Sequence, residues 1–219
     1  MGGTDAENVQ DGLFQQTLRG RAMNTAGDEL RWIVYTDPAA VAAAAASRVL
    51  ASAERAVSAR GAFRIVLAGG GTPHALYRRL ADMDSQWSAW HVYFGDERCL
   101  PPIDPDRNSR MAAEALLDRV PIPRQQVYTI PAELGPGAGA KAYAPVVEAG
   151  LPFDLVLLGL GEDGHTASLF PGQPVASGLV AGIDDAPKAP AQRVTLNPQA
   201  LAAAEQVLVL VTGGGKRAA

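Results

Sequence analysis

The run Phe153-Asp154-Leu155-Val156-Leu157-Leu158 constrains the fold of this chain more than any other segment. Its apolar residues do not alternate with polar ones, which predicts a strand buried on both faces, as in a parallel sheet. Closely spaced glycines follow, and then an acid, an imidazole and two hydroxyls at 163–168. Because open α/β sheets place their sites at the carboxyl ends of their strands, this polar cluster is predicted to lie in the functional crevice.

Strand-like and helix-like segments alternate along the rest of the chain. One helix is predicted to begin at Pro38, with Asp37 as its N-cap, and Gly61 can end it. The alternation predicts an α/β fold with three layers: a doubly wound, mostly parallel sheet with helices on both faces. Further helices are expected through 76–80, 107–117, 140–148 and from 198, strands at 30–36, 63–68, 90–94, 127–130, 193–195 and 207–211, and loops at 135–139 and 172–191.

Size and composition indicate a single-domain protein and argue against binding to nucleic acid or to a membrane. The 219 residues contain no linker between two cores, so we expect a single domain at 30–219 and a flexible extension at 1–29. A net charge of −4 without a basic run argues against nucleic-acid binding, although a local positive cluster could still hold a phosphorylated small molecule. Cys99 is the only cysteine, and we find neither a signal peptide nor a membrane span. We therefore expect a cytoplasmic protein that binds no membrane.

Glycines and cations mark the ends of several predicted strands. In Gly69-Gly70-Gly71-Thr72, backbone N–H groups and a helix N-terminus can bind an anion, or the glycines can simply form a tight turn. In Asp96-Glu97-Arg98, the guanidinium suits a phosphate or a carboxylate, unless it forms a local salt bridge. Lys216 is a second phosphate candidate or a solvated lysine, and Arg193 could donate from the preceding strand. These segments could converge with 161–168 at one sheet edge, which is the main argument for a site.

His165 is the candidate general base. Imidazole titrates near neutral pH and can take a proton from water. Asp163 or Glu162 could orient the ring or hold a substrate hydroxyl. A lone histidine is more often structural, but this one follows a glycine-rich turn after a buried strand, which favours a functional role.

Other catalytic classes fit these residues less well. Gly159, Gly161 and Gly164 have the spacing of a dinucleotide fingerprint, but Pro171 would stop the long helix that such a turn must open. A Walker A loop would need a lysine where His165 stands. The sequence has no serine-hydrolase elbow and no ligand spacing typical of a metal site, so we expect no metal.

Several of these segments together resemble the 6-phosphogluconolactonase family, in the superfamily that also holds glucosamine-6-phosphate deaminase and ribose-5-phosphate isomerase-like folds. The resemblance runs from about residue 30 to the end, and its longest motif is very specific. The motifs are Leu67-Ala68-Gly69-Gly70-Gly71-Thr72-Pro73, Phe94-Gly95-Asp96-Glu97-Arg98 with Asn108 downstream, the segment 159–172, Arg193-x-Thr195 and Gly213-x-x-Lys216.

The resemblance implies hydrolysis of 6-phospho-D-glucono-1,5-lactone to 6-phosphogluconate, in the oxidative pentose phosphate pathway, without a cofactor. His165 would activate water, with Asp163 beside it, and backbone N–H groups of 161–165 are candidates for stabilising the oxyanion. The partner would be the sugar-phosphate lactone, bound by a monomer or a weak homo-oligomer. Matching positions for substrate and phosphate binding are Gly70, Gly71, Thr72, Asp96, Arg98, Asn108, Gly161, Gly164, Arg193 and Lys216.

Three other functions fit these residues less well. In the deaminase branch a catalytic Glu stands at the position of Phe170, which cannot move protons, and a Tyr stands at that of Arg98. A non-catalytic sugar-phosphate sensor would lack His165 or the phosphate cations, and a nicotinamide-dependent oxidoreductase would need the interrupted helix. The family usually continues past Gly-x-x-Lys with a helix and a strand, so the domain is expected to lack these or to be part of a longer chain.

Overall fold

The computed structural model describes residues 31–217 and 219. The chain divides into two units, Met1–Val34 and Tyr35–Ala219. In the first unit, residues 31–34 have no helix or strand, and Val34 is 83% exposed. The predicted strand at 30–36 is therefore wrong over its described residues. β-branched and aromatic residues favour a strand only where neighbouring strands pack against them, and these residues are exposed. The extension expected at 1–29 lies outside the described residues.

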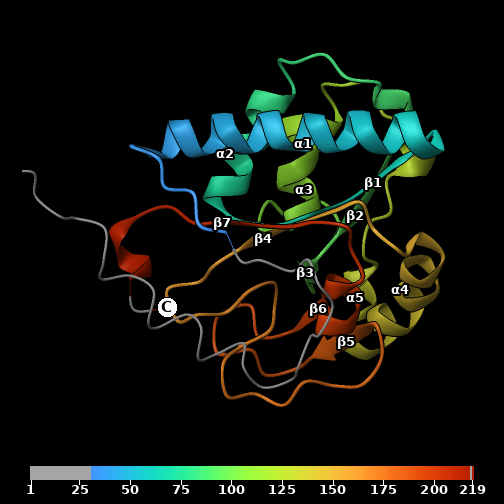
Figure 1. The fold of residues 1–219 in the computed structure, drawn as a ribbon. Helices are drawn as coiled ribbons and strands as arrows, with labels where there is room; N and C mark the ends of the chain where they lie inside the picture. The colour runs from blue at the N-terminus through green and yellow to red at the C-terminus, as the bar shows by residue number, and fades with distance from the viewer. Residues whose placement is uncertain (1–30, 218) are drawn as a thin grey trace, which may run out of the picture. The chain divides into compact units, whose positions relative to one another are not determined.

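A four-stranded parallel sheet forms the centre of the second unit (Figure 1). Its strands lie in the order β2 (Trp90–Phe94), β1 (Phe63–Leu67), β4 (Leu155–Gly159) and β7 (Val207–Leu210). Strand β4 is paired on both sides, and its residues 155–158 are all buried. This burial explains why the strand has a continuous apolar run instead of alternating polar and apolar residues.

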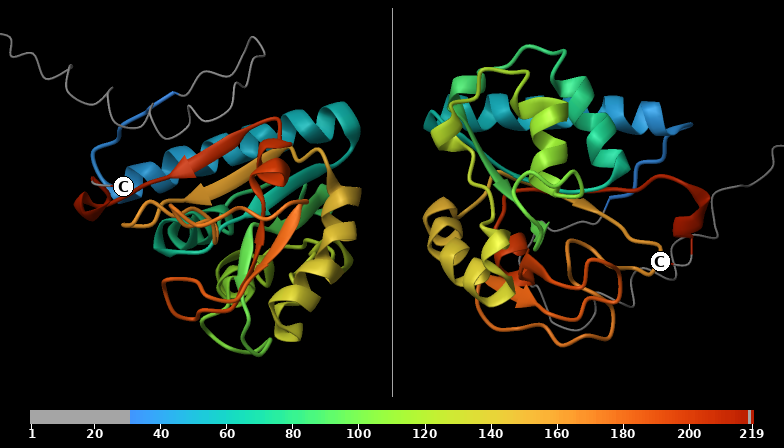
Figure 2. Two further views of the ribbon diagram at one scale, coloured as in Figure 1. Left: turned by 90° about the horizontal axis from the view of Figure 1, so that it is seen from below. Right: turned by 180° about the vertical axis from the view of Figure 1, so that it is seen from behind.

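Helices cover both faces of this sheet (Figures 1 and 2). Helices α1 (Pro38–Arg60), α2 (Gly71–Leu80) and α3 (Asn108–Ala112) lie on one face, and α4 (Pro136–Gly150) and α5 (Pro198–Ala202) lie on the other. The Asp37 carboxylate accepts a hydrogen bond from the Ala40 N–H at 2.8 Å, and Gly61 ends α1 with a φ of 72°. The predicted α/β class, with a mostly parallel sheet between helices, is confirmed.

A second, antiparallel sheet lies beside α4 and was not predicted. Its strands are ordered β3 (Asp96–Arg98), β6 (Arg193–Leu196) and β5 (Val180–Ile183). Strand β5 lies inside the predicted loop 172–191, and α4 begins inside the predicted loop 135–139. A Cβ on Gly182 would lie 2.5 Å from the Pro136 carbonyl carbon, so glycine allows this helix and strand to approach closely.

Short helical turns complete the described chain. The predicted helix 107–117 is α3 followed by a π-helical turn at Ala113–Leu117, and the predicted strand 127–130 is reduced to one bridge between Val92 and Val127. None of the helices in the described ranges is long and apolar enough to cross a bilayer. The 3₁₀ turns are η1 (Trp87–Ala89), η3 (Arg124–Gln126), η4 (Ala132–Leu134) and η5 (Gly214–Lys216).

Candidate active site

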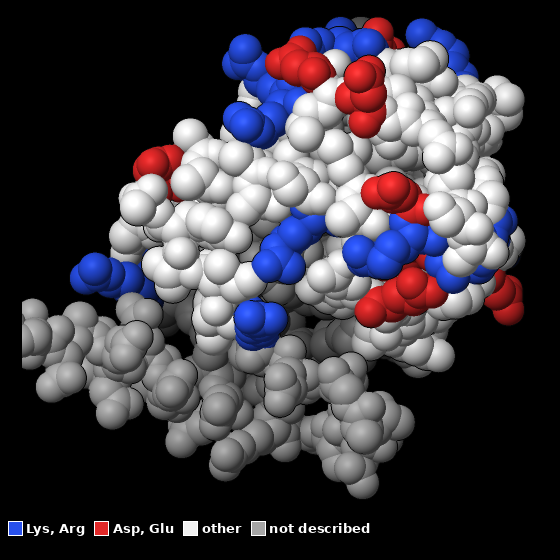
Figure 3. Space-filling view, turned by 45° about the horizontal axis from the view of Figure 1, so that its top comes forward, with Lys and Arg blue, Asp and Glu red and all other residues white. Residues whose placement is uncertain are grey.

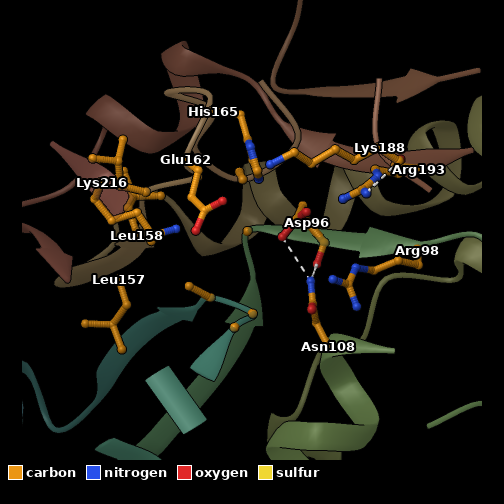
Figure 4. A pocket seen from close by; sticks show the side chains of 18 residues that line it. Asp96, Arg98, Asn108, Leu157, Leu158, Glu162, His165, Lys188, Arg193 and Lys216 are labelled. Atoms are coloured by element: carbon orange, nitrogen blue, oxygen red, sulfur yellow. Dashed lines mark hydrogen bonds between the residues drawn. The ribbon is translucent and has the colours of Figure 1, made fainter. Parts of the chain in front are cut away.

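A pocket of about 250 Å³ opens where β1 and β4 end, beside β3, β6 and η5 (Figure 4). Most of the predicted site residues line it, and Lys188 and Glu162 join them. Gly71, Thr72, Asp163 and Gly164 do not line it, although Gly71, Asp163 and Gly164 each adjoin a residue that does. The predicted residues on its wall are Gly70, Asp96, Arg98, Asn108, Gly161, His165, Arg193 and Lys216.

His165 and Asp163 form a hydrogen-bonded pair at the pocket wall. The His165 Nδ1 and Asp163 Oδ1 atoms are 2.5 Å apart, and the His165 side chain is 20% exposed. Burial alone would raise the pKa of Asp163, but hydrogen bonds from His165 and Lys188 outweigh it and hold the pKa well below its usual range. An ionised carboxylate on Nδ1 orients the ring and places its proton there, which leaves Nε2 as the basic nitrogen.

Two backbone hydrogen bonds close the turn 161–165, which carries His165 and Asp163. Gly161 N–H donates to the His165 carbonyl at 2.7 Å, and Gly164 N–H donates to the Gly161 carbonyl at 3.2 Å. Gly164 has a φ of 84°, which favours glycine. These two N–H groups therefore bond within the turn, and the other N–H groups of 161–165 stay candidates for stabilising an oxyanion.

Asp96 is buried at the floor of the pocket and is held from two directions. Its carboxylate accepts hydrogen bonds from Ser168 Oγ at 2.7 Å and from Asn108 Nδ2 at 3.0 Å. Burial raises the pKa of Asp96, and the Ser168 hydroxyl opposes this rise. Gly69 packs against the Asn108 amide so closely that a Cβ there would overlap it. Asn108 thus joins the end of β1 to β3.

Glu97 organises the backbone next to the site from a fully buried position. Its carboxylate accepts hydrogen bonds from the N–H groups of Arg98, Asn108 and Ser109, at 2.9, 2.7 and 2.8 Å. The Nε of buried Arg107 lies 3.3 Å from it and compensates its charge. Arg98, whose backbone N–H bonds to Glu97, has a buried side-chain Nε without a hydrogen-bond acceptor in the described part of the chain. The Nη1 of the same guanidinium donates to the Asp106 carbonyl, and Arg98 lines the pocket.

Arg193 holds the loop that brings Lys188 to the pocket. Its guanidinium donates to the carbonyls of Pro190 and Lys188, both at 3.0 Å, and to that of Ala189 at 3.3 Å. The Lys188 Nζ then lies 3.2 Å from Asp163 Oδ1. Lys188 was not predicted, because it lies in the predicted loop 172–191, which follows no predicted strand directly. The nearby Arg193 is the one sequence signal that could have drawn attention to it.

The loop after β1 is fixed by side chains on both sides. The Tyr77 hydroxyl accepts from the Ala68 N–H at 2.9 Å and donates to the Ala68 carbonyl at 2.8 Å. The hydroxyls of Thr72 and Thr212 are 2.6 Å apart, so Thr72 joins this loop to the segment before η5. Gly70 has a φ of 101°, a conformation that favours glycine.

Positive charge lies at both ends of the pocket. Figure 4 shows Lys216 on one side of His165 and Glu162, and Arg98, Arg193 and Lys188 on the other. On the face shown in Figure 3, acidic and basic side chains are interspersed and form no continuous basic tract. No cluster of three His, Cys, Asp or Glu residues that could hold a metal ion occurs among the described residues. The arrangement suits proton transfer to or from a small, anionic substrate.

The α/β fold and a pocket lined by cations are those of an enzyme that acts on a small molecule. The chain belongs to the glucosamine-6-phosphate isomerases/6-phosphogluconolactonase family, whose model matches residues 36–219. The Mycobacterium tuberculosis 6-phosphogluconolactonase is 40% identical over 200 residues, which cover 84% of this chain and 81% of the relative.

Two solved structures have a similar fold. The Trypanosoma brucei 6-phosphogluconolactonase superposes with a TM-score of 0.76 at 32% identity, over 84% of this chain and 82% of that one. A monomeric glucosamine-6-phosphate deaminase superposes with a TM-score of 0.68 at 18% identity, over 80% of this chain and 79% of that one. At that identity, the deaminase shows a shared fold alone.

Proposed function

We propose that this chain hydrolyses 6-phospho-D-glucono-1,5-lactone to 6-phospho-D-gluconate, the lactone-opening step of the oxidative pentose phosphate pathway. The observation that carries the proposal is the Asp163–His165 pair, with 2.5 Å between Oδ1 and Nδ1, on the wall of a pocket with cations at both ends. The relatives that share 37–40% identity over most of the chain and are named 6-phosphogluconolactonase support this choice of substrate.

In the proposed reaction, His165 acts as the general base. Its Nε2 takes a proton from a water molecule as the water oxygen attacks C1 of the lactone. Asp163 stays ionised and stabilises the imidazolium that forms. The imidazolium then gives its proton to the ring oxygen as the bond between C1 and that oxygen breaks. The products are the open-chain acid and the neutral imidazole, so the cycle needs no cofactor.

The substrate's charges are proposed to bind the cations of the pocket. Arg98, Lys216 and the loop 70–72 would bind the 6-phosphate, and Arg193 would add positive potential from its buried position. Arg98 and Lys216 line the pocket, which supports their assignment to an anion. Fixed donors near C1 would stabilise the oxyanion more than water does, because they need no reorganisation. Asp96 and Asn108 are proposed to bind sugar hydroxyls from the pocket floor.

The deaminase alternative finds less support in the same pocket. The Phe170 ring packs 4.8 Å from the His165 ring, centre to centre, and Phe170 is 7% exposed. A carboxylate that moves protons, as in the deaminase branch, is thus replaced by a buried apolar ring. This ring would also limit solvent access to one side of the imidazole.

Several broader features belong to the same proposal. We infer a single catalytic domain, which the family match at 36–219 supports. We further infer a cytoplasmic enzyme that acts as a monomer or a weak homo-oligomer and binds no nucleic acid. The net charge of −4 and the interspersed charges in Figure 3 support the last inference.

Hydrolysis of freshly generated lactone tests the proposal. Acid release is followed with and without the protein and corrected for spontaneous ring opening. We expect His165→Gln to lower kcat by roughly 10²–10⁴-fold, and His74→Gln, in α2 outside the pocket, to leave it unchanged. Full activity of His165→Gln would mean that another group is the base. A folded wild type that binds 6-phosphogluconate without turnover would instead be a sensor.

A further inference from the structure

Ser168 lies behind the pocket, in the same loop as the proposed base. It is 1% exposed and does not line the pocket. Its Oγ donates a hydrogen bond to Asp96 Oδ2 at 2.7 Å, and Asp96, which is itself buried, does line the pocket. Ser168 can therefore act on a ligand only through another residue, and Asp96 is the pocket residue to which its hydroxyl bonds.

A tight turn brings Ser168 to the pocket floor. The N–H of Thr166 donates to the Leu169 carbonyl at 3.2 Å, and the N–H of Leu169 donates to the Thr166 carbonyl at 2.9 Å, so residues 167 and 168 form the tip of the turn. Ala167 has a φ of 49°, a left-handed conformation that alanine rarely adopts. Such strain persists only where the surrounding structure holds it in place. Ser168 supplies two such contacts, its Oγ bond to the carboxylate and a bond from its N–H to Thr195 Oγ1 at 3.2 Å.

The Asp96 carboxylate is held at both of its oxygens. Within the described chain, Oδ2 accepts from Ser168, and Oδ1 accepts from Asn108 Nδ2 at 3.0 Å (Figure 4). A carboxylate has about four lone-pair positions, so two donors leave about two for a ligand. Without the Ser168 hydroxyl only Oδ1 would be held, and the carboxylate could turn about χ2, which is a soft torsion in aspartate.

From this geometry we infer that Ser168 is a positioning residue that fixes the Asp96 carboxylate for the sugar hydroxyls of the substrate. The inference rests on the proposed lactonase function, in which Asp96 binds those hydroxyls. A carboxylate that is already ordered binds a hydroxyl at a lower entropic cost than one that must be ordered on binding. Ser168 therefore contributes to affinity for the sugar without touching it.

The loop of the base has other contacts that do not need this hydroxyl. Thr166 Oγ1 donates to the Gly159 carbonyl at 2.8 Å, and the Ser168 N–H bond to Thr195 uses the backbone. Both bonds remain possible in Ser168→Ala. His165 should therefore keep its position, and the loss should fall on substrate binding and not on proton transfer.

The kinetic constants of Ser168→Ala for lactone hydrolysis test the inference. We expect KM to rise roughly tenfold, the low end for a hydrogen bond to a charged group, because Asn108 still holds the other oxygen. We expect kcat to stay within about threefold, because a hydroxyl contact away from C1 is equally strong in the ground state and the transition state. Ser52→Ala is the matched control. Ser52 on α1 is 4% exposed, does not line the pocket and donates to Gln206 Oε1 at 3.0 Å, so this variant also loses a buried hydrogen bond but should leave both constants unchanged.

A double variant separates action through Asp96 from a general loss of stability. Asp96→Asn should raise KM by itself, and Ser168→Ala added to it should change KM by less than about twofold, since no carboxylate is left to position. Effects that multiply would overturn the inference. An unchanged KM in Ser168→Ala, or a fall in kcat alone, would also overturn it. Ser168→Cys, with a weak donor of similar size, replaces the alanine variant if that variant does not fold.

Calorimetric binding of 6-phosphogluconate makes the same comparison without turnover. Its Kd should rise roughly tenfold in Ser168→Ala. A wild type that binds 6-phosphogluconate but hydrolyses no lactone would refute the proposed function, while the Kd of the variant would still test Ser168. A wild type that hydrolyses the lactone, with Ser168→Ala equal to it, would refute the role of Ser168 alone. A wild type that does neither would refute both.

Discussion

Gly161→Ala is expected to disable the site while the fold stays intact. Gly161 has a backbone conformation that alanine can adopt, since its φ is not positive. A Cβ at this position would nevertheless overlap His165 Nδ1 and Asp163 Oδ1, the two atoms whose hydrogen bond orients the base. One methyl group would therefore enter the space that the pair occupies.

The size of the loss follows from the displacement. Ordinary van der Waals contact begins at 3.4 Å, so both side chains would have to retreat by about 1 Å or more. A misplacement of about 1 Å lowers the rate roughly 10²-fold, which corresponds to about 2.7 kcal/mol of transition-state stabilisation. The free energy of unfolding should change by less than about 1 kcal/mol, because the overlapping atoms are the ends of side chains that can rotate away.

Two measurements on the same variant separate these effects. The first is kcat/KM for 6-phosphogluconolactone, and the second is the urea midpoint of unfolding. Gly137→Ala, in α4, is the control, because a Cβ there meets no atom within 4 Å. Activity of Gly161→Ala within about threefold of the wild type would refute the argument that the pair needs this space. A large loss of stability would refute the argument that only the site is affected.

Two further predictions concern stability. Glu97→Gln is expected to lower the free energy of unfolding by about 2–3 kcal/mol, because buried Arg107 would lose one of its two charge partners. A change below about 0.5 kcal/mol in urea denaturation would contradict this. Burial raises the pKa of Tyr77, Tyr93 and Tyr143, that of Tyr93 to about 12, so these phenols stay neutral in the folded state while the unfolded chain ionises above about pH 10. The free energy of unfolding should therefore fall as the pH rises from about 10 to 12, and a constant urea midpoint would contradict the assignment.

The parallel sheet could be predicted because burial leaves a simple pattern in the sequence. Strand β4 begins with a continuous apolar run, β1 is apolar except for Arg64, and α1 has both an N-cap and a terminating glycine. Strand β5 could not be predicted in the same way. Only Ala181 of its residues is buried, and the Pro- and Gly-rich composition around it is typical of a loop. It is a strand because β6 pairs with it, which is a tertiary effect.

Some residues of the candidate site could likewise be predicted from the local sequence, and others depend on tertiary contacts. Asp96 and Arg98 come just after β2, and His165 lies in the turn after β4, so the parallel order of β2 and β4 brings them to the same edge of the sheet. Lys188 reaches the pocket through hydrogen bonds from Arg193 to its loop, and sequence spacing does not encode such a contact. The hydrogen bonds that two N–H groups of the turn 161–165 make within the turn could not be predicted either, because they depend on the folded shape of the turn.

The pocket wall joins parts of the chain as distant as Ala68 and Lys216. The pocket therefore exists only when the whole second unit has folded. A ligand that binds in the pocket stabilises that entire unit. At a concentration of about 100 times its Kd, such a ligand adds about 2.7 kcal/mol to the free energy of unfolding. Global melting thus becomes a readout of occupancy, so thermal shifts can rank sugar phosphates by affinity before any turnover is measured.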